Sequence, residues 1–485
     1  MRPRVIRERT STESPGVDPI AHSPQLRDVD AGRRPGLLHR LGRRLWFPMA
    51  LLIAVAVAFV ALGPLSQTPA GEPLLAVAPP GASLSEPFVA AAGASATEQE
   101  IAKRFETVRQ APDTVLAYVL LGNAYLQHVR ETGDPSDYGR AAAAFEEALR
   151  REPENVDALI GQGVLRLARH QFRDALEPGR RALELAPSTA RVYGVIVDAQ
   201  TELGMYDEAV ASTQRMVDLR PDLASYSRVS YQRELRGDVD GAIEAMDRAF
   251  RAATGTSVEN REYVRVLIGD LHLLNGDART AERIQRASLE AAPDFVWALA
   301  GLARARAAQG DLDGAVGLYQ RAVDAIPLPE FVIALGETQQ AAGRTEEAGR
   351  SYELVRAIQQ LFAVNGVNVD LDLALFEADH GSDPGGAVEL ARRAYADQPN
   401  LKAADALGWA LHKNGQHDEA RRYAEESLRL GSPYARYLFH AGMIASAQGD
   451  TEAARGYLKR SIDDHADLTP LYRQQAEAEL GMLGG

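Results

Sequence analysis

The residues with the greatest potential for chemistry gather between positions 370 and 380, where Asp370, Asp372, Glu377, Asp379 and His380 occur together. Glu377 and His380 are three residues apart, so they share a helical face, as ligands do in carboxylate-bridged metal bundles. Such a bundle needs a second Glu-x-x-His pair, and the chain has none. We therefore interpret the cluster as a solvated edge and a turn, and we predict no metal site.

The other histidines and glycines form no recognisable ligand or catalytic set. His412 and His417 are five residues apart, a spacing that does not place both side chains on one helical face. Gly161 and Gly163 lack the third glycine of a dinucleotide site, so we assign them to close helix crossing. The chain has no cysteine, no Gly-x-Ser-x-Gly, no phosphate loop and no His-Glu-x-x-His. The sequence predicts no catalytic residue, no cofactor and no enzyme activity.

Most of the chain repeats one pattern, and residues 296–327 are its clearest copy. Apolar residues recur every three or four positions on both sides of Gly310, which predicts two helices that each bury one face. Gly310 suits the end of the first helix, where a positive φ costs glycine nothing. Pro327 ends the second helix because it lacks the N–H that would continue it. One unit is therefore a helix, a tight turn and an antiparallel helix.

The unit recurs with a period of 34 residues. This spacing separates Pro153, Pro187 and Pro221, and it also separates Pro293 and Pro327. A small residue stands 12 positions before each of these prolines: Ala141, Ala175, Ala209, Ala281 and Ala315. This pattern resembles the tetratricopeptide repeat, with about ten units over residues 98–480.

The resemblance implies an all-α fold, a helix-turn-helix solenoid wound into a superhelix. It also implies that the first helix of each repeat lines a concave groove that holds protein partners. The groove residues of this chain would then include Asn123, Arg191, Asp198, Glu202, Arg228, Gln232, Arg236, Trp297 and Arg304. Trp and Arg are the residue types that most often anchor interfaces. The alternative is that these side chains only solvate the groove.

Charge is distributed unevenly along the 485 residues. Residues 1–45 carry ten Arg against five Asp or Glu, a balance of +5, which leaves −19 for the rest of a chain whose net charge is −14. An acidic body argues against nucleic-acid binding, which needs a basic stripe. The abundance of Ala and Arg over Lys is typical of GC-rich bacterial genomes. The sequence assigns no oligomeric state.

The N-terminal region predicts a membrane anchor. The sequence predicts that residues 1–45 form a disordered, basic cytoplasmic tail, and residues 46–65 carry no charge at all. Twenty helical residues span about 30 Å, the thickness of a bilayer core. The arginines lie on one side only, so the positive-inside rule places the N-terminus in the cytoplasm and the repeats outside it, at the cell inner membrane.

A cleaved signal peptide is the main alternative to the anchor, because Ala76-Val77-Ala78 resembles a cleavage site. The long tail before the apolar stretch favours the anchor. Residues 66–95 are rich in Pro, Ala and Gly and predict a linker, and residues 96–483 hold the solenoid and a polar capping helix.

These patterns together predict a non-catalytic, membrane-tethered scaffold that binds protein partners. One alternative is an assembly or export factor for envelope polysaccharide or surface appendages, a role that anchored proteins of the resembled family fill. A second alternative is an enzyme whose site lies in an interruption of the repeat pattern, at 128–135 or 362–380. The first interruption offers His128, Arg130, Glu131 and Asp134, but no triad.

Overall fold

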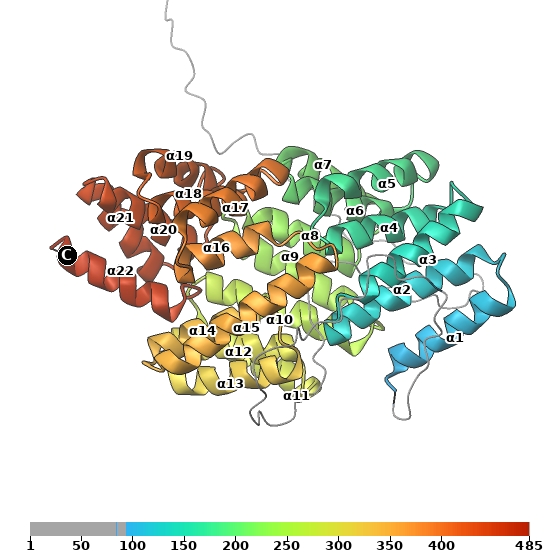
Figure 1. Cartoon of the computed structure of the whole chain (residues 1–485), viewed down its shortest axis with the longest axis horizontal. Coiled ribbons are helices and arrows are strands. Elements are labelled where there is room, and N and C mark those ends of the chain that lie inside the picture. Colours follow the sequence, from blue (N-terminus) through green and yellow to red (C-terminus); the bar gives the residue numbers. More distant parts are fainter. Residues whose placement is uncertain (1–83, 85–93, 485) are drawn as a thin grey trace, which may run out of the picture.

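The protein is described from a computed structural model that covers Leu84 and residues 94–484. Within these residues the chain forms 22 helices and no strand, which confirms the all-α prediction (Figure 1). The helices are α1 Ala96–Gln110, α2 Val115–Thr132, α3 Asp137–Arg151, α4 Val156–Ala168, α5 Phe172–Leu185, α6 Ala190–Glu202, α7 Tyr206–Leu219, α8 Leu223–Glu234, α9 Val239–Ala252, α10 Val258–Leu274, α11 Ala278–Ala291, α12 Val296–Ala308, α13 Leu312–Ala325, α14 Pro329–Ala341, α15 Thr345–Val364, α16 Asp370–His380, α17 Pro384–Asp397, α18 Leu401–Lys413, α19 His417–Ser427, α20 Ala435–Ala447, α21 Thr451–Asp463 and α22 Pro470–Met482.

The predicted tail at 1–45 and the apolar segment at 46–65 lie outside the described residues, as does nearly all of the linker at 66–95. Among the helices that the structure describes, none combines the length and the apolar character needed to cross a bilayer.

Helices α12 and α13 show how one repeat is built. Gly310 lies between them with a φ of 86°, the left-handed conformation that the sequence pattern predicts for it. The side chain of Asp311 then accepts a hydrogen bond from Gly314 N at 2.9 Å and caps α13. Ala315 is fully buried, so the two helices approach closely at the small residue. Glycines serve the same purpose elsewhere: a Cβ on Gly122 would lie only 2.7 Å from the ring of Phe145, which supports close crossing as the role of these small residues.

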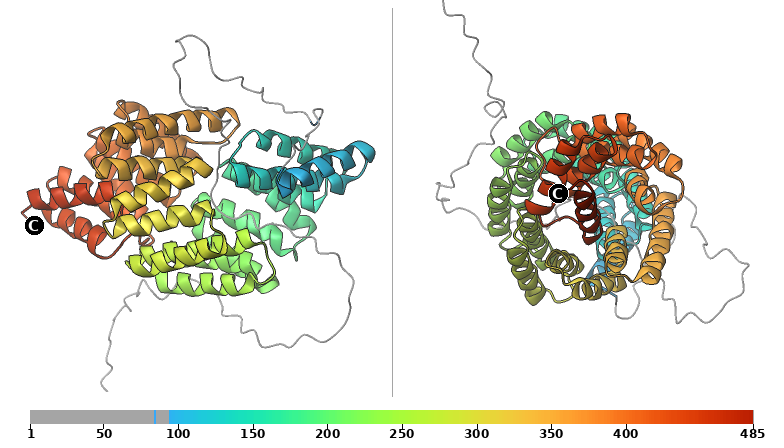
Figure 2. Two further views of the ribbon diagram at one scale, coloured as in Figure 1. Left: turned by 90° about the horizontal axis from the view of Figure 1, so that it is seen from below. Right: turned by 90° about the vertical axis from the view of Figure 1, so that its left-hand side faces the viewer.

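The first helices of successive repeats face the inside of the superhelix. Contacts join α2 to α4, α4 to α6, α10 to α12 and α16 to α18, whereas the second helices pack mainly on their own partner and on the next first helix. Seen along its long axis, the molecule is a ring of helices, with the C-terminal helix within the ring (Figure 2). The first helices therefore make an inner wall.

Successive turns of the superhelix touch, and the contacts recur in register. The turn at the end of one first helix meets the start of another first helix 191 to 200 residues later. The joined groups are His170 Nδ1 with Asn368 O, Asn400 Nδ2 with Glu202 O, Ser432 Oγ with Leu235 O, and His465 Nδ1 with Leu274 O, at 3.0, 2.8, 2.7 and 2.9 Å. In three of these contacts, those to Glu202 O, Leu235 O and Leu274 O, a backbone carbonyl left over at the end of a helix gains a hydrogen-bond partner.

The first eight residues of the interruption predicted at 362–380, residues 362–369, have a structural role. Helix α15 continues to Val364 because Phe362 is buried in the core. Asn368 N then donates to Arg169 O at 2.9 Å, in the preceding turn of the superhelix. The extra residues thus let the chain reach the first of the contacts between turns.

The last helix does more than cap the array. Helix α22 packs against α14, four repeats earlier, as well as against α20 and α21. Gln474 Nε2 donates to Ala341 O at 3.1 Å, and Leu471, Tyr472 and Ala476 are buried. The polar side chains of α22 led to the prediction of a polar cap, but the helix also buries an apolar face against the inner wall.

Asn400 offers a test of the contacts between turns. It caps α18 through Ala403 N, and its amide also donates to Glu202 O at 2.8 Å and to Glu202 Oε2 at 3.2 Å, all buried. Asp is an equally good cap, but it cannot donate and would place a second carboxylate beside Glu202. We expect Asn400→Asp to lower the free energy of unfolding by about 1–3 kcal/mol, measured by urea denaturation.

Asn155→Asp is the matched control, because Asn155 caps α4 in the same way but donates to the exposed Glu152. We expect that change to alter stability by less than about 0.5 kcal/mol. Equal effects of the two substitutions would contradict a stabilising role for the contacts between turns.

Candidate functional site

All but one of the residues predicted to line the groove lie on first helices, and the exception, Arg236, directly follows one. Asn123 is on α2, and Trp297 and Arg304 are on α12. The remaining six belong to the neighbouring helices α6 and α8: Arg191, Asp198, Glu202, Arg228, Gln232 and Arg236, of which Arg236 follows the end of α8. The structure therefore places the set on the inner wall.

A ladder of ion pairs runs along this wall. Asp157 pairs with Arg191, Asp198 with Arg228, and Asp270 with Arg304. A fourth pair, Asp405 with Arg436 at 3.1 Å, stands on α18 and α20. The partners are 30 to 34 residues apart, so each pair joins two successive first helices. The wall thus satisfies much of its own charge.

The pair on α6 and α8 is the most deeply buried of those predicted for the groove. Arg228 is only 3% exposed and Gln232 only 2%. Arg228 Nε donates to Asp198 Oδ1 at 2.8 Å and Nη2 to Asp198 Oδ2 at 2.5 Å, a bidentate arrangement. Gln232 Nε2 donates to Thr201 Oγ1 at 2.8 Å, and Arg236 Nη2 donates to Tyr206 O at 3.1 Å.

This burial corrects one expectation. Arg228 and Gln232 were expected to face the groove, and their spacing of four residues places both on one helical face, but that spacing does not show what covers the face. Glu202 is also covered, since Asn400 and Lys402 of the next superhelical turn contact it. Binding of a partner by these three residues stays a prediction, and it would require the covering contacts to open.

The part of the wall between α10 and α14 is more accessible. Tyr263, Trp297 and Phe331 occupy equivalent positions in three successive repeats, and their rings meet edge to face with centroids 5.6 and 5.1 Å apart. Trp297 is half-buried, and the Arg304 side chain is 35% exposed. Asn123, on α2, is also half-buried. Phe331 is only 1% exposed, so Tyr263, Trp297, Arg304 and Asn123 are the members of this group that can still meet a partner.

Several carboxyl groups on the inner side have raised pKa values. Burial raises the pKa of Glu330 to about 8, those of Glu234 and Asp467 to about 7, and that of Asp198 to about 6. Asp198 keeps a lower value than the others because Arg228 lies against it. The wall is therefore less negative near neutral pH than its composition indicates. Sequence reasoning missed Glu330, Glu234 and Asp467, because only the closed ring encloses them.

The first interruption, at 128–135, holds a structural network. His128 Nδ1 lies 2.5 Å from Asp137 Oδ2, and Arg140 Nη1 lies 2.7 Å from Asp137 Oδ1. The hydrogen bond to Asp137 raises the pKa of His128. Asp137 is buried, so the group holds α2 against α3 and presents no nucleophile.

The cluster at 370–380 is divided by the structure. Glu377 pairs with Arg356 at 3.0 Å, whereas the His380 side chain is only 6% exposed and points to Glu337 of α14. The expectation of a solvated edge is therefore wrong for His380. Glu337, Asp379 and His380 instead place three potential ligand atoms within 4.8 Å of one another. Sequence reasoning missed Glu337 because it lies 43 residues before His380 and belongs to another repeat.

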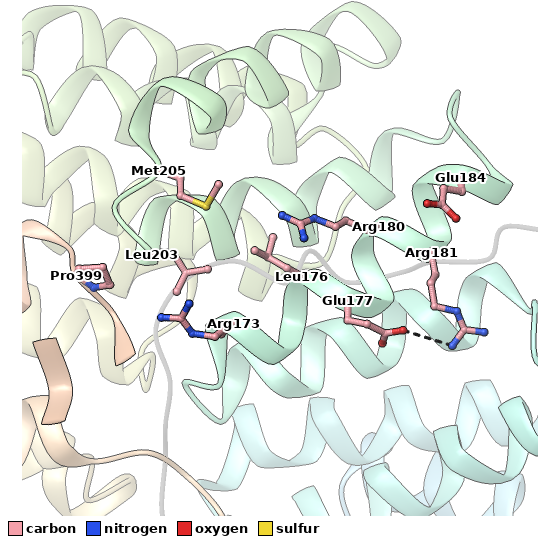
Figure 3. A pocket seen from close by; sticks show the side chains of 9 residues that line it. All are labelled: Arg173, Leu176, Glu177, Arg180, Arg181, Glu184, Leu203, Met205 and Pro399. Atoms are coloured by element: carbon pink, nitrogen blue, oxygen red, sulfur yellow. Dashed lines mark ion pairs between the residues drawn. The ribbon is translucent and has the colours of Figure 1, made fainter. Parts of the chain in front are cut away.

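Two further features lie away from the predicted groove. The rings of His412 and His417 come within 5.0 Å across the turn between α18 and α19, although their spacing did not predict it. A hollow of about 490 Å³ lies beside α5, near the contact between superhelical turns (Figure 3). It is lined by Arg173, Leu176, Glu177, Arg180, Arg181, Glu184, Leu203, Met205 and Pro399.

The buried ion pair allows a direct test. Arg228→Ala leaves the Asp198 carboxylate buried without its partner, so we expect a loss of about 3–5 kcal/mol in the free energy of unfolding. Arg191→Ala removes the equivalent rung of the ladder where both side chains are more than one-third exposed, and we expect a loss below about 1 kcal/mol. Urea denaturation of both variants measures the difference. Similar losses would show that burial does not set the strength of these pairs.

The raised pKa of Glu330 predicts how stability depends on pH. A carboxyl whose pKa is raised on folding stabilises the protein fully below its unfolded pKa of about 4.5, and loses that contribution as pH rises through about 8. Stability should therefore fall between pH 5 and pH 8, and Glu330→Gln should reduce this slope. Urea midpoints across this range measure it.

Glu147 provides a control, because its pKa is lowered on folding whereas that of Glu330 is raised. Arg150 and Arg151 lower its pKa, so its contribution is lost only as pH falls below its unfolded value. Glu147→Gln should leave the slope between pH 5 and pH 8 unchanged. An unchanged slope in Glu330→Gln would contradict the assignment to Glu330.

Comparison with known proteins agrees with the repeat geometry. Residues 134–190, 266–328 and 406–468 match the family model described as tetratricopeptide repeat. No curated protein sequence matches the chain.

Solved structures of similar architecture include the APC/C hetero-tetramer Cut9-Hcn1, with 13% identity over 80% of this chain and 96% of that chain and a TM-score of 0.36. Another is the human IFIT1 dimer with PPP-AAAA, with 13% identity over 76% and 90% and a TM-score of 0.42. A third is a tetratricopeptide repeat protein from Parabacteroides merdae, with 15% identity over 54% and 99% and a TM-score of 0.32. At these identities the likeness concerns the fold alone. The 34-residue helix pairs, their glycine turns and the three matched stretches identify the chain as a tetratricopeptide repeat protein.

Proposed function

We propose that this protein is a membrane-tethered scaffold that binds protein partners along its inner wall, on the outer side of a bacterial inner membrane. Tetratricopeptide solenoids generally mediate protein–protein interaction and are typically non-catalytic. The single observation that carries the proposal is the accessible stretch of wall between α10 and α14.

This stretch has the composition of a binding surface. Tyr263 and Trp297 supply two partly exposed rings, and the ring of Trp297 packs in turn on the buried ring of Phe331. Arg304 stands about two helical turns further along α12, with Asp270 beside it. Aromatic and Arg side chains in partly buried settings are the common anchors of protein interfaces. Because Asp270 holds Arg304 in two hydrogen bonds of 2.7 and 2.8 Å, the guanidinium is already oriented before a partner arrives.

The tether and the side of the membrane rest on the sequence. The uncharged stretch at 46–65 and the arginines before it support an anchor with a cytoplasmic N-terminus. Protease treatment of spheroplasts tests this topology: the repeats should be degraded without lysis, and protection of the repeats would refute it.

The charge of the solenoid supports a protein rather than a nucleic acid as partner, because the chain after residue 45 carries −19. The alternative is that the same tethered scaffold acts as an assembly or export factor for envelope polysaccharide or surface appendages. Recovery of glycosyltransferases or secretion components as the partners would favour that role.

A crosslinking experiment tests the binding surface. We expect Trp297→Ala combined with Arg304→Ala to lower the yield of partners crosslinked from membranes at least about tenfold, since anchors of this kind contribute about 2 kcal/mol or more. The matched control is Arg286→Ala on the outer helix α11, whose side chain is 50% exposed. Retention of every partner by the double variant would show that this stretch of wall is not the binding surface.

A further inference from the structure

We propose that Glu337, Asp379 and His380 form a binding site for one divalent transition-metal ion, for which Zn²⁺ is the best match. The three residues come from α14 and the C-terminal end of α16, two neighbouring first helices on the inner wall. One ligand atom from each lies within 4.8 Å of the other two. This inference concerns a site distinct from the partner-binding stretch between α10 and α14.

The spacing of the two central atoms favours a shared ion over a direct hydrogen bond. His380 Nε2 lies 3.5 Å from Glu337 Oε1 and has no hydrogen-bond partner, although the imidazole is more than nine-tenths buried. A hydrogen bond would bring these atoms to about 2.7–3.2 Å. Two ligands bound to one tetrahedral Zn²⁺ at 2.0–2.1 Å stand about 3.3–3.5 Å apart. The imidazole nitrogen is thus placed where a metal ligand would be.

Charge balance points the same way. Glu337 and Asp379 bring two carboxylates into a largely buried place, and among the described residues no Lys or Arg forms an ion pair with either. The guanidinium of Arg356 on α15 is bonded to Glu377 Oε1 and to His380 O. Buried carboxylates need a compensating charge, and a divalent cation with a neutral imidazole supplies it.

The surrounding residues hold the ligands in place. Trp409 Nε1 donates to Asp379 Oδ1 at 2.8 Å, and Tyr472 Oη donates to Asp379 Oδ2 at 2.5 Å. The ring of Tyr352 stacks on His380 with centroids 4.0 Å apart. Outer partners of this kind orient ligands and raise metal affinity.

The donor set selects among ions. One imidazole with two carboxylates suits Zn²⁺ or a similar transition metal better than Mg²⁺ or Ca²⁺, which prefer oxygen alone. Three protein ligands leave one position of a tetrahedron for water. Because Tyr472 belongs to α22, the ion would also strengthen the docking of the last helix onto the inner wall.

The test uses the full chain, purified, stripped with a chelator and titrated with Co²⁺. We expect one Co²⁺ per chain with the visible absorption of a tetrahedral site, displacement by Zn²⁺ but not by equal Mg²⁺, and a higher Tm with Zn²⁺. Glu337→Gln and His380→Asn should each weaken binding by at least about tenfold. Glu377→Gln, on the same helix and three residues from His380, should bind as the wild type does.

Three outcomes would overturn the proposal. The first is a wild-type chain that takes up no Co²⁺, a result that needs no variant to be folded. The second is unchanged affinity in Glu337→Gln and His380→Asn while far-UV circular dichroism shows intact helices. The third is loss of binding in His412→Asn but not in those variants, which would place the ion at His412 and His417.

Discussion

The 34-residue register between helix pairs is the constraint on which the inner wall depends. Small residues such as Ala315 recur at the crossing points and are buried there, so each pair packs on the next in a repeating arrangement. Side chains one period apart therefore come to lie beside each other. The ladder that includes Asp270 and Arg304, and the row of rings centred on Trp297, are both products of this repetition.

Contact between superhelical turns adds a second level of order to this solenoid. A repeat array bound only to its nearest neighbours can stretch and unwind, because its stability is a sum of local terms. Here the ends of α4, α6, α8 and α10 bond to segments about 200 residues later, and α22 folds back onto α14. These contacts enclose part of the inner wall. Polar residues such as Gln232 are therefore buried, and burial raises the pKa of carboxyl groups such as Glu330.

The two corrected expectations have the same physical origin. Sequence spacing shows which residues share a helical face, as it did for Arg228 and Gln232, but it does not show what lies opposite that face. Asp198 and Thr201 of the preceding helix cover those two residues. In the same way, the shared helical face of Glu377 and His380 did not show that the His380 imidazole faces Glu337 of the adjacent first helix while Glu377 pairs with Arg356.

The sequence by itself determined the helix pairs and their glycine turns, because these follow from local periodicity and backbone conformation. The assignment of first helices to the inner side came from the resemblance to the tetratricopeptide repeat. The tail, the apolar segment at 46–65 and the linker rest on the sequence alone. Only the tertiary structure decided which wall residues are exposed, which carboxyl groups are enclosed and that Glu337, Asp379 and His380 meet. Those properties depend on the pitch of the superhelix, which sums small rotations over many repeats and cannot be read from any one of them.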